Sequence, residues 1–246
     1  MRLYKYRDLA RPNAEEFRRL KVLLHRQAFW CARPDTLNDP EEFAWVCDYT
    51  ATDETPALLA RLLTQAQRRS LDDSRARAME TIATGRFETI VAPTIAKIIE
   101  KCRAEIGLVC FGSSSENPIL WQRYGGNSAG VCVEIDVPDD LMESQLFAVQ
   151  YPTHKVIHID QLMRAVLDNG HVREVYSLSL LSKPSSWAPE AEIRFISKMQ
   201  DVLVSIDRSR ISGLILGHAL EPAARTAIEH IVDTAPYPLP ILAHVA

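Results

Sequence analysis

The pattern of apolar and polar positions predicts both strands and helices along the chain. Residues 1–7 alternate between apolar and charged side chains, which predicts a short strand. Apolar residues at helical spacing predict helices from residue 14 onward, over 55–105, over 158–168 and over 222–232. Segments rich in Val, Ile and Phe predict further strands over 29–32, 107–112, 130–136, 147–151, 192–196, 211–217 and 240–245.

The order of these segments indicates an α+β fold. Helices and strands do not alternate as regular βαβ units, and the sequence has no repeat period and no low-complexity linker. We therefore expect one α+β domain over residues 1–246, with the charged helical segment 55–105 as an insertion within it.

Composition narrows the functional classes. The 246 residues carry 28 Lys and Arg against 32 Asp and Glu, a balance that does not favour a protein that coats nucleic acid. The five cysteines form no CxxC pair, which is typical of reduced thiols in a cytoplasmic protein. No apolar run reaches the ~20 residues of a membrane helix, so no membrane partner is expected.

Two glutamates near residue 190 are the main candidates for chemistry. In a strand, Glu190, Glu192 and Arg194 are two residues apart and point to the same face. Neighbouring carboxylates suit general acid–base work or the stabilisation of a cationic transition state. The same spacing also suits an exposed strand that carries cross-strand charge pairs, and both interpretations stay open.

Aromatic residues accompany charges in two other segments. Trp121 and Tyr124 are three residues apart, as expected for a platform on which a flat ring stacks. Tyr4, Tyr6 and Arg7 lie together on the first predicted strand. Aromatic residues at these spacings are equally consistent with a simple hydrophobic core.

The order of six motifs resembles a bacterial family known only as a domain of unknown function, over nearly the whole chain. The motifs are Leu-Tyr-Lys-Tyr-Arg at 3–7, Asn-Asp-Pro-Glu-Glu at 38–42, Cys-Phe at 110–111, Trp-x-x-Tyr at 121–124, Gly-x-Cys-x-Glu-x-Asp at 130–136, and Lys183 and Trp187 before Glu-x-Glu-x-Arg at 190–194. The helical segment 55–105 is the part that the resemblance covers least.

The layout also resembles, more distantly, ADP-ribosyltransferases with a split two-sheet core. That resemblance implies NAD as the substrate, no metal, and catalytic roles for Glu192, Glu190 and Arg7. It implies that NAD is contacted by Tyr4, Tyr6, Arg7, Trp121, Tyr124, Lys183 and Arg194. The expected reaction is ADP-ribosyl transfer to a protein or nucleic acid, or NAD hydrolysis, in a toxin or a phage-defence effector.

The same residues are also compatible with two other functions. A metal-dependent nuclease would use Asp39 and Glu42 together with the late glutamates as ligands. A non-catalytic module would use the same side chains to recognise a protein or nucleic acid. The enzyme that cleaves NAD requires Arg7, Tyr124 and Glu192 to converge on one site, whereas the nuclease requires Asp39 beside Glu190 or Glu192.

Overall fold

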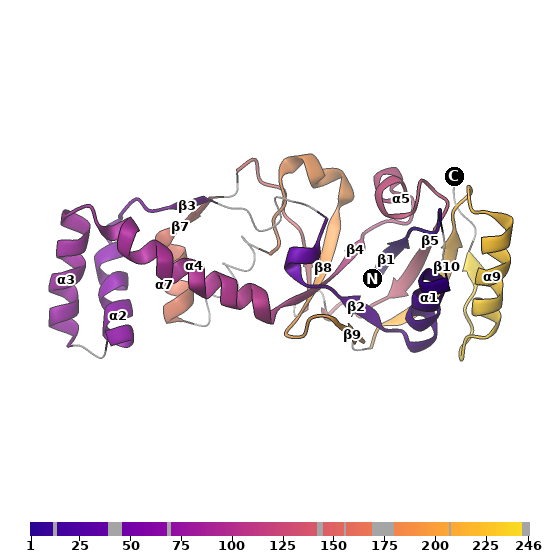
Figure 1. Cartoon of the computed structure of the whole chain (residues 1–246), viewed down its shortest axis with the longest axis horizontal. Helices are drawn as coiled ribbons and strands as arrows, with labels where there is room; N and C mark the ends of the chain where they lie inside the picture. Colours follow the sequence, from indigo (N-terminus) through magenta and orange to yellow (C-terminus); the bar gives the residue numbers. More distant parts are fainter. Residues whose placement is uncertain are drawn as a thin grey trace. The chain divides into compact units, whose positions relative to one another are not determined.

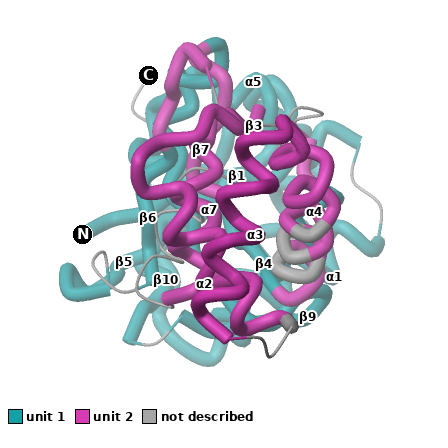
Figure 2. Tube along the Cα trace, turned by 90° about the vertical axis from the view of Figure 1, so that its left-hand side faces the viewer, with its two compact units in different colours: residues 1–36, 106–149, 186–246 teal, residues 37–105, 150–185 magenta. Residues whose placement is uncertain are grey.

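The computed structural model shows a mixed α+β protein, so the α+β part of the predicted fold is confirmed. The structure describes residues 1–11, 14–38, 46–67, 70–141, 145–154, 156–168, 180–206 and 208–242, with backbone only at 67, 94, 98, 99, 101 and 102. Figure 2 shows two compact units, residues 1–36, 106–149 and 186–246 in the first, and residues 37–105 and 150–185 in the second. The segment 55–105 thus shares its unit with residues 37–54, which precede it, and with residues 150–185.

A seven-stranded sheet forms the centre of the first unit (Figure 1). Its strands are, in spatial order, β11 (Ile241–Leu242), β10 (Arg210–Leu216), β5 (Val131–Asp136), β1 (Arg2–Arg7), β4 (Gly107–Gly112), β8 (Glu192–Ser197) and β6 (Leu146–Ala148). Neighbouring strands are antiparallel except for β10 and β11. A separate antiparallel pair joins β2 (Phe29–Cys31) to β9 (Val202–Val204).

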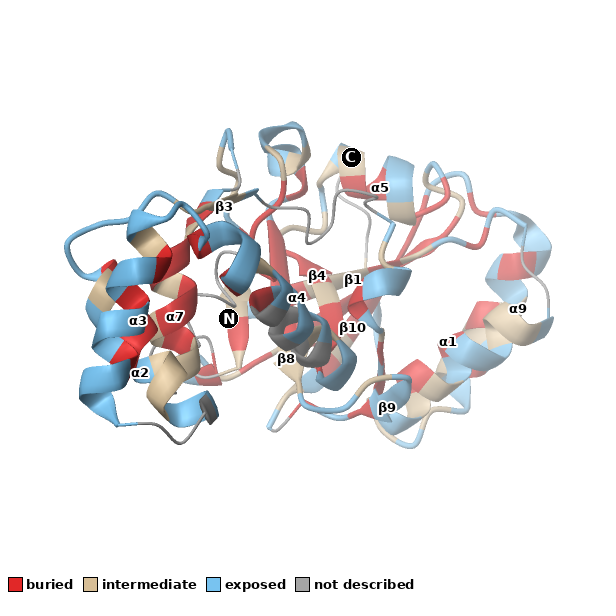
Figure 3. Ribbon diagram, turned by 60° about the vertical axis from the view of Figure 1, so that its left-hand side comes forward, coloured by how far each residue is buried: buried red, intermediate tan, exposed pale blue. Residues whose placement is uncertain are grey.

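Helices cover both faces of this sheet. Leu3 of β1 belongs to the main core, together with buried residues of α1 (Ala14–Arg26) and α9 (Pro222–Asp233). Figure 3 shows how buried and exposed positions follow one another along these two helices, as in amphipathic helices. Tyr6 belongs instead to a smaller cluster with Leu120 and Trp121 of α5 (Pro118–Tyr124). We call this second side of the sheet the α5 face.

The second unit is mainly helical. It contains α2 (Thr55–Gln67), α3 (Leu71–Ala83), α4 (Phe87–Glu105), α7 (Ile159–Leu167), and the parallel pair β3 (Val46–Asp48) and β7 (Val156–His158). Apolar residues from all four helices and from β7 form its core, which confirms the helical spacing seen over 55–105. Among the described residues, no helix is both long enough and apolar enough to cross a membrane.

Most of the predicted elements are confirmed within one or two residues. The strand predicted over 147–151 is shifted: β6 ends at Ala148, and the Gln150 N–H donates to the Leu181 carbonyl oxygen at 2.7 Å rather than continuing the ladder. Of the strand predicted over 240–245, Ile241–Leu242 forms β11, and residues from 243 onward lie outside the described part. Asn13, the residue before the helix predicted from residue 14 onward, also lies outside it.

Candidate functional site

The register of the sheet places several candidate residues on the α5 face. Tyr4 lies opposite both Gly112 of β4 and Glu134 of β5, and Gly112 lies opposite Glu192 of β8. Side chains that are directly opposite one another in neighbouring strands point to the same face. Glu134, Tyr4, Gly112 and Glu192 therefore form one row across four strands.

Glu192 and Arg194 form an ion pair on this face. The Arg194 Nε donates to Glu192 Oε1 at 2.8 Å, and Nη2 donates to Oε2 at 3.2 Å. Both residues are buried, and Arg194 is fully buried. A bidentate pair fixes the orientation of both side chains, and each charge offsets part of the cost of burying the other.

Cys110 lies directly opposite Arg194 and beside Glu192. Burial, followed by the negative charge of Glu192, raises the pKa of the Cys110 thiol to about 12. Only the thiolate is a good nucleophile, so Cys110 stays protonated and unreactive near neutral pH.

Glu190 does not lie on the strand, so the predicted Glu-x-Glu strand face is wrong. It ends a 3-10 helix, η3 (Ser185–Glu190), and Ala191 has a φ of 45° before β8 begins at Glu192. Pro189 has no N–H to donate to a neighbouring strand, and the left-handed conformation of Ala191 is not that of a strand. The alternation of side chains in β8 therefore does not extend back to Glu190.

Helix α5 holds Glu190 in place. The Tyr124 hydroxyl and Arg123 Nη1 donate to the same oxygen of Glu190, Oε1, at 2.8 and 2.9 Å. The Arg123 guanidinium also lies 4.4 Å from the centre of the Trp187 ring, a cation–π contact. Tyr124 and Glu190 therefore meet, as expected for residues of one site.

The start of α5 is fixed to the same segment. Asn117 caps the helix, since its Oδ1 accepts hydrogen bonds from the N–H groups of Ile119 and Leu120. The Asn117 side-chain amide donates in turn to the Pro189 carbonyl oxygen at 2.7 Å. One residue thus joins the helix N-terminus to the segment that ends at Glu190.

Trp121 and Tyr6 are packed against each other. Their rings meet edge to face, with centroids 5.2 Å apart, and both side chains are buried. Trp121 Nε1 donates to the Ser115 carbonyl oxygen at 2.7 Å, and the Tyr6 hydroxyl donates to that of Ser114 at 2.6 Å. These contacts are typical of aromatic residues in a core, whose polar atoms find partners when buried.

The structure adds a buried carboxylate to which sequence reasoning gave no role. Glu134 accepts hydrogen bonds from Arg2 Nη1 at 3.3 Å, from the Tyr4 hydroxyl at 3.5 Å and from the Ser212 hydroxyl at 3.0 Å. Burial, followed by the charge of Glu134, raises the pKa of Tyr4. The feature of the sequence that could have pointed to Glu134 is an acidic residue within the apolar segment 130–136.

Arg7 lies on the other face of the sheet. It shares the alternation of Leu3 rather than that of Tyr6, and the charged groups that act on it, Glu16 and Arg19, belong to α1. Burial lowers the pKa of its guanidinium, and its buried Nε has no hydrogen-bond partner among the described residues. The structure therefore does not bring Arg7 together with Tyr124 and Glu192.

The other candidates lie elsewhere. Lys183 belongs to the second unit, where it is buried and its N–H donates to the Gln150 carbonyl oxygen at 2.9 Å. Asp39 and Glu42, the ligands proposed for a nuclease, lie outside the described residues. Within the described part of the chain, no group of three or more His, Cys, Asp or Glu side chains is arranged to hold a metal ion.

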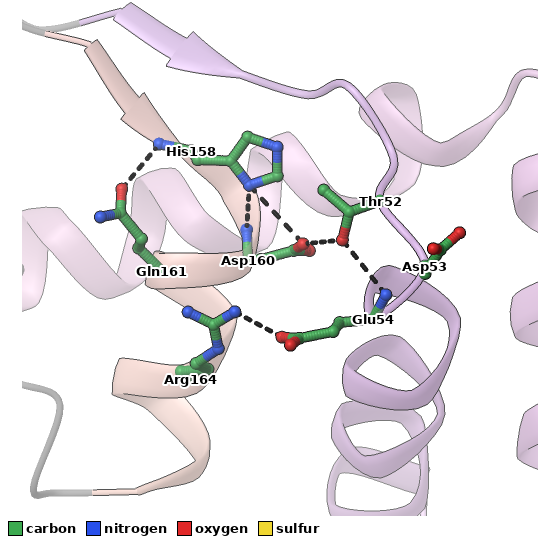
Figure 4. Close-up of a pocket in the computed structure, with 7 residues that line it drawn as sticks. All are labelled: Thr52, Asp53, Glu54, His158, Asp160, Gln161 and Arg164. Atoms are coloured by element: carbon green, nitrogen blue, oxygen red, sulfur yellow. Dashed lines mark hydrogen bonds and ion pairs between the residues drawn. The ribbon is translucent and has the colours of Figure 1, made fainter.

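A polar cavity of about 480 Å³ lies in the second unit (Figure 4). Asp160, in the first turn of α7, accepts hydrogen bonds from the Thr52 hydroxyl at 2.6 Å and the Thr55 hydroxyl at 2.8 Å. His158 caps the same helix, because its Nδ1 accepts the Asp160 N–H at 3.2 Å. These bonds join the N-terminal ends of α2 and α7, so the polar groups have a structural role.

Comparison with known proteins adds no relative: no family model matches the chain, and no curated protein or solved structure matches it.

Proposed function

We propose that the α5 face of the first unit binds NAD and cleaves the bond between nicotinamide and ribose. The observation that carries this proposal is that Tyr124 and Arg123 converge on Glu190, two residues before the buried pair of Glu192 and Arg194. Two carboxylates with fixed orientations, close in sequence and beside aromatic rings, suit a reaction that passes through a ribosyl cation.

The proposed step breaks the bond between C1′ of the ribose and the nicotinamide nitrogen. The bonding electron pair leaves with nicotinamide, and the ribose carbon gains oxocarbenium character. The Glu192 carboxylate stabilises this charge more strongly in the transition state than in the bound substrate. Water, or a nucleophile of a protein or nucleic acid acceptor, then bonds to C1′ and passes its proton to Glu190.

The side chains around the two acids act as positioning residues. Arg194 holds both oxygens of Glu192, and Tyr124 and Arg123 hold Oε1 of Glu190. Arg7 has no part in this version of the site, because it lies on the opposite face. The activity is the one that the resemblance to the split two-sheet ADP-ribosyltransferases implies, and the assay below tests it.

The proposal is tested by incubating the purified full chain with NAD and measuring free nicotinamide. We expect Glu192→Gln, which keeps the shape and removes the charge, to lower the rate by about 100–1000-fold. Arg7→Gln is the matched control, and its rate should equal that of the wild type. Circular dichroism of both variants confirms that they fold. If the wild type releases no nicotinamide, with or without protein and nucleic acid acceptors, the proposal fails.

A second candidate is a non-catalytic recognition surface for a protein or nucleic acid. It is favoured by the complete pairing of Glu192, whose two oxygens both accept hydrogen bonds from Arg194. A fixed, compensated charge suits binding more than turnover. Calorimetric titration distinguishes the two, since this alternative predicts no heat on addition of NAD.

A further inference from the structure

A cavity of about 400 Å³ lies in the first unit, where β5 ends and β10 begins. Its walls include Gln27, Asp136, Arg210, Ser212 and Tyr237. None of these residues belongs to the site of the proposed function. The volume is in the range that small-molecule sites occupy.

Two irregularities of the backbone lie beside this cavity. Gln27, just after α1, has a φ of 49°, a left-handed conformation that is unfavourable for a residue with a side chain. The register of β10 with β5 shifts between Ile211 and Gly213, which makes Ser212 the extra residue of a β-bulge. Strained residues and bulges are frequent where a side chain has to be aimed at a ligand.

The polar atoms of the cavity keep capacity for further hydrogen bonds. Gln27 Oε1 accepts the Ile211 N–H at 2.9 Å, which leaves the Gln27 amide nitrogen as a donor. The Ser212 hydroxyl donates to Glu134 at 3.0 Å, which leaves its oxygen as an acceptor. The Arg210 guanidinium is 3.6 Å from the Asp136 carboxylate and 76% exposed.

Charge around the cavity is balanced. Arg2 lies between two acids, with Nη1 3.3 Å from Glu134 and Nε 3.5 Å from Asp136. With Arg210 on the other side of Asp136, two arginines face two carboxylates. An anionic ligand would meet the charge of Asp136 and a cationic one that of Arg210, so the site favours a neutral ligand with several hydroxyl groups.

Tyr237 supplies an apolar wall. Its hydroxyl donates a hydrogen bond to the Leu24 carbonyl oxygen, which fixes the position of the ring. Pro238 follows it in the wall of the same cavity. A fixed aromatic ring beside a few convergent polar groups is the usual composition of a small-molecule site.

We propose that this cavity binds a neutral sugar ring. Asp136 accepts hydrogen bonds from two neighbouring hydroxyls of the sugar, and Arg210 donates to their oxygens. The Gln27 amide and the Ser212 oxygen bind a third hydroxyl, and the C–H face of the ring packs on Tyr237. A free monosaccharide and the ribose of a nucleoside offer the same vicinal hydroxyls, so either source satisfies the site.

The test is saturation-transfer NMR on the full chain with D-ribose, D-glucose and adenosine as separate probes. We expect transfer to the sugar protons of at least one probe, and a preference for adenosine over D-ribose would identify a nucleoside as the source. Arg210→Gln removes one charged donor and should weaken binding about tenfold. Arg225→Gln, an exposed arginine on α9, is the matched control and should bind as the wild type does.

Two further variants make the result specific. Tyr237→Phe keeps the ring and should keep most of the binding, whereas Glu192→Gln, which removes the proposed catalytic charge, should leave sugar binding unchanged. Absence of transfer to all three probes in the wild type would overturn the proposal. Equal binding by the wild type and Arg210→Gln would overturn it as well.

Discussion

The Thr55 hydroxyl donates a hydrogen bond to Asp160 at 2.8 Å, and this bond connects the first residue of α2 with the first turn of α7, over 100 positions later in the chain. Both side chains are buried, and Thr52 donates to the other oxygen of Asp160. The carboxylate therefore lies at the N-terminal ends of two helices, where a negative charge is stabilised.

We predict that Asp160→Ala destabilises the second unit by about 3 kcal/mol, because it leaves two threonine hydroxyls without their acceptor and removes a charge from the helix ends. Asp53→Ala is the control, since Asp53 lines the same cavity but is exposed. Urea unfolding followed by circular dichroism measures both. A change of less than about 0.5 kcal/mol for Asp160→Ala would show that the network adds little.

The buried pair on β8 gives a second prediction. Arg194→Leu leaves the Glu192 carboxylate buried without the guanidinium that binds both of its oxygens, and we expect a loss of about 3–5 kcal/mol. The double variant Arg194→Leu/Glu192→Leu removes both charges and should recover part of that loss. Arg18→Ala, which breaks an exposed pair with Glu15, should lower stability far less than Arg194→Leu does, because solvent screens the exposed charges. Recovery in the double variant is the decisive measurement.

Stability should depend on pH through Cys110. Its pKa is raised to about 12 in the folded protein, from an ordinary value of 9.0. Above pH 9 the unfolded chain loses this proton while the folded chain keeps it, so the free energy of unfolding falls as pH rises from 9 to 12. Cys110→Ala should show a shallower decrease. Identical slopes for the two proteins between these pH values would exclude a contribution from this thiol.

Gly112 permits the close approach of α5 to the sheet. A Cβ atom at this position would lie 2.4 Å from Leu120 Cδ1 and 3.4 Å from Tyr6 Cε2. We expect Gly112→Ala to cost about 1–3 kcal/mol, because α5 or its side chains must shift. Adding Leu120→Ala should relieve the contact, so the two changes together should cost less than their sum. Additive losses in thermal unfolding would contradict this explanation.

Local pattern was enough to predict most elements. The segments 107–112 and 192–196 are dense in apolar and β-branched residues, and they form neighbouring strands of the sheet. The helix over 158–168 has its apolar residues on one side, and His158 and Asp168 are its caps. These features depend on residues that are close in the sequence.

The arrangement of the site depends on distant residues, so the sequence did not reveal it. The role of Glu134 requires Arg2 and Ser212, which lie 132 and 78 positions away. Alternation along β1 places Arg7 and Tyr6 on opposite faces of the sheet. Only the packing of Tyr6 on α5 and the charges of α1 near Arg7 show which face each helix covers. The spacing of Glu190 and Glu192 favours a strand, but Glu190 ends a 3-10 helix that contains Pro189 and is followed by the left-handed Ala191.

The position of β1 in the middle of the sheet has a consequence for folding. Tyr4 pairs with Gly112 on one side and with Glu134 on the other, so β1 needs both of its neighbours from parts of the chain that are synthesised much later. Long-range pairing of this kind slows folding and leaves strand edges open in the meantime. During synthesis, β1 therefore lacks one of its two sheet neighbours until β5 has been made.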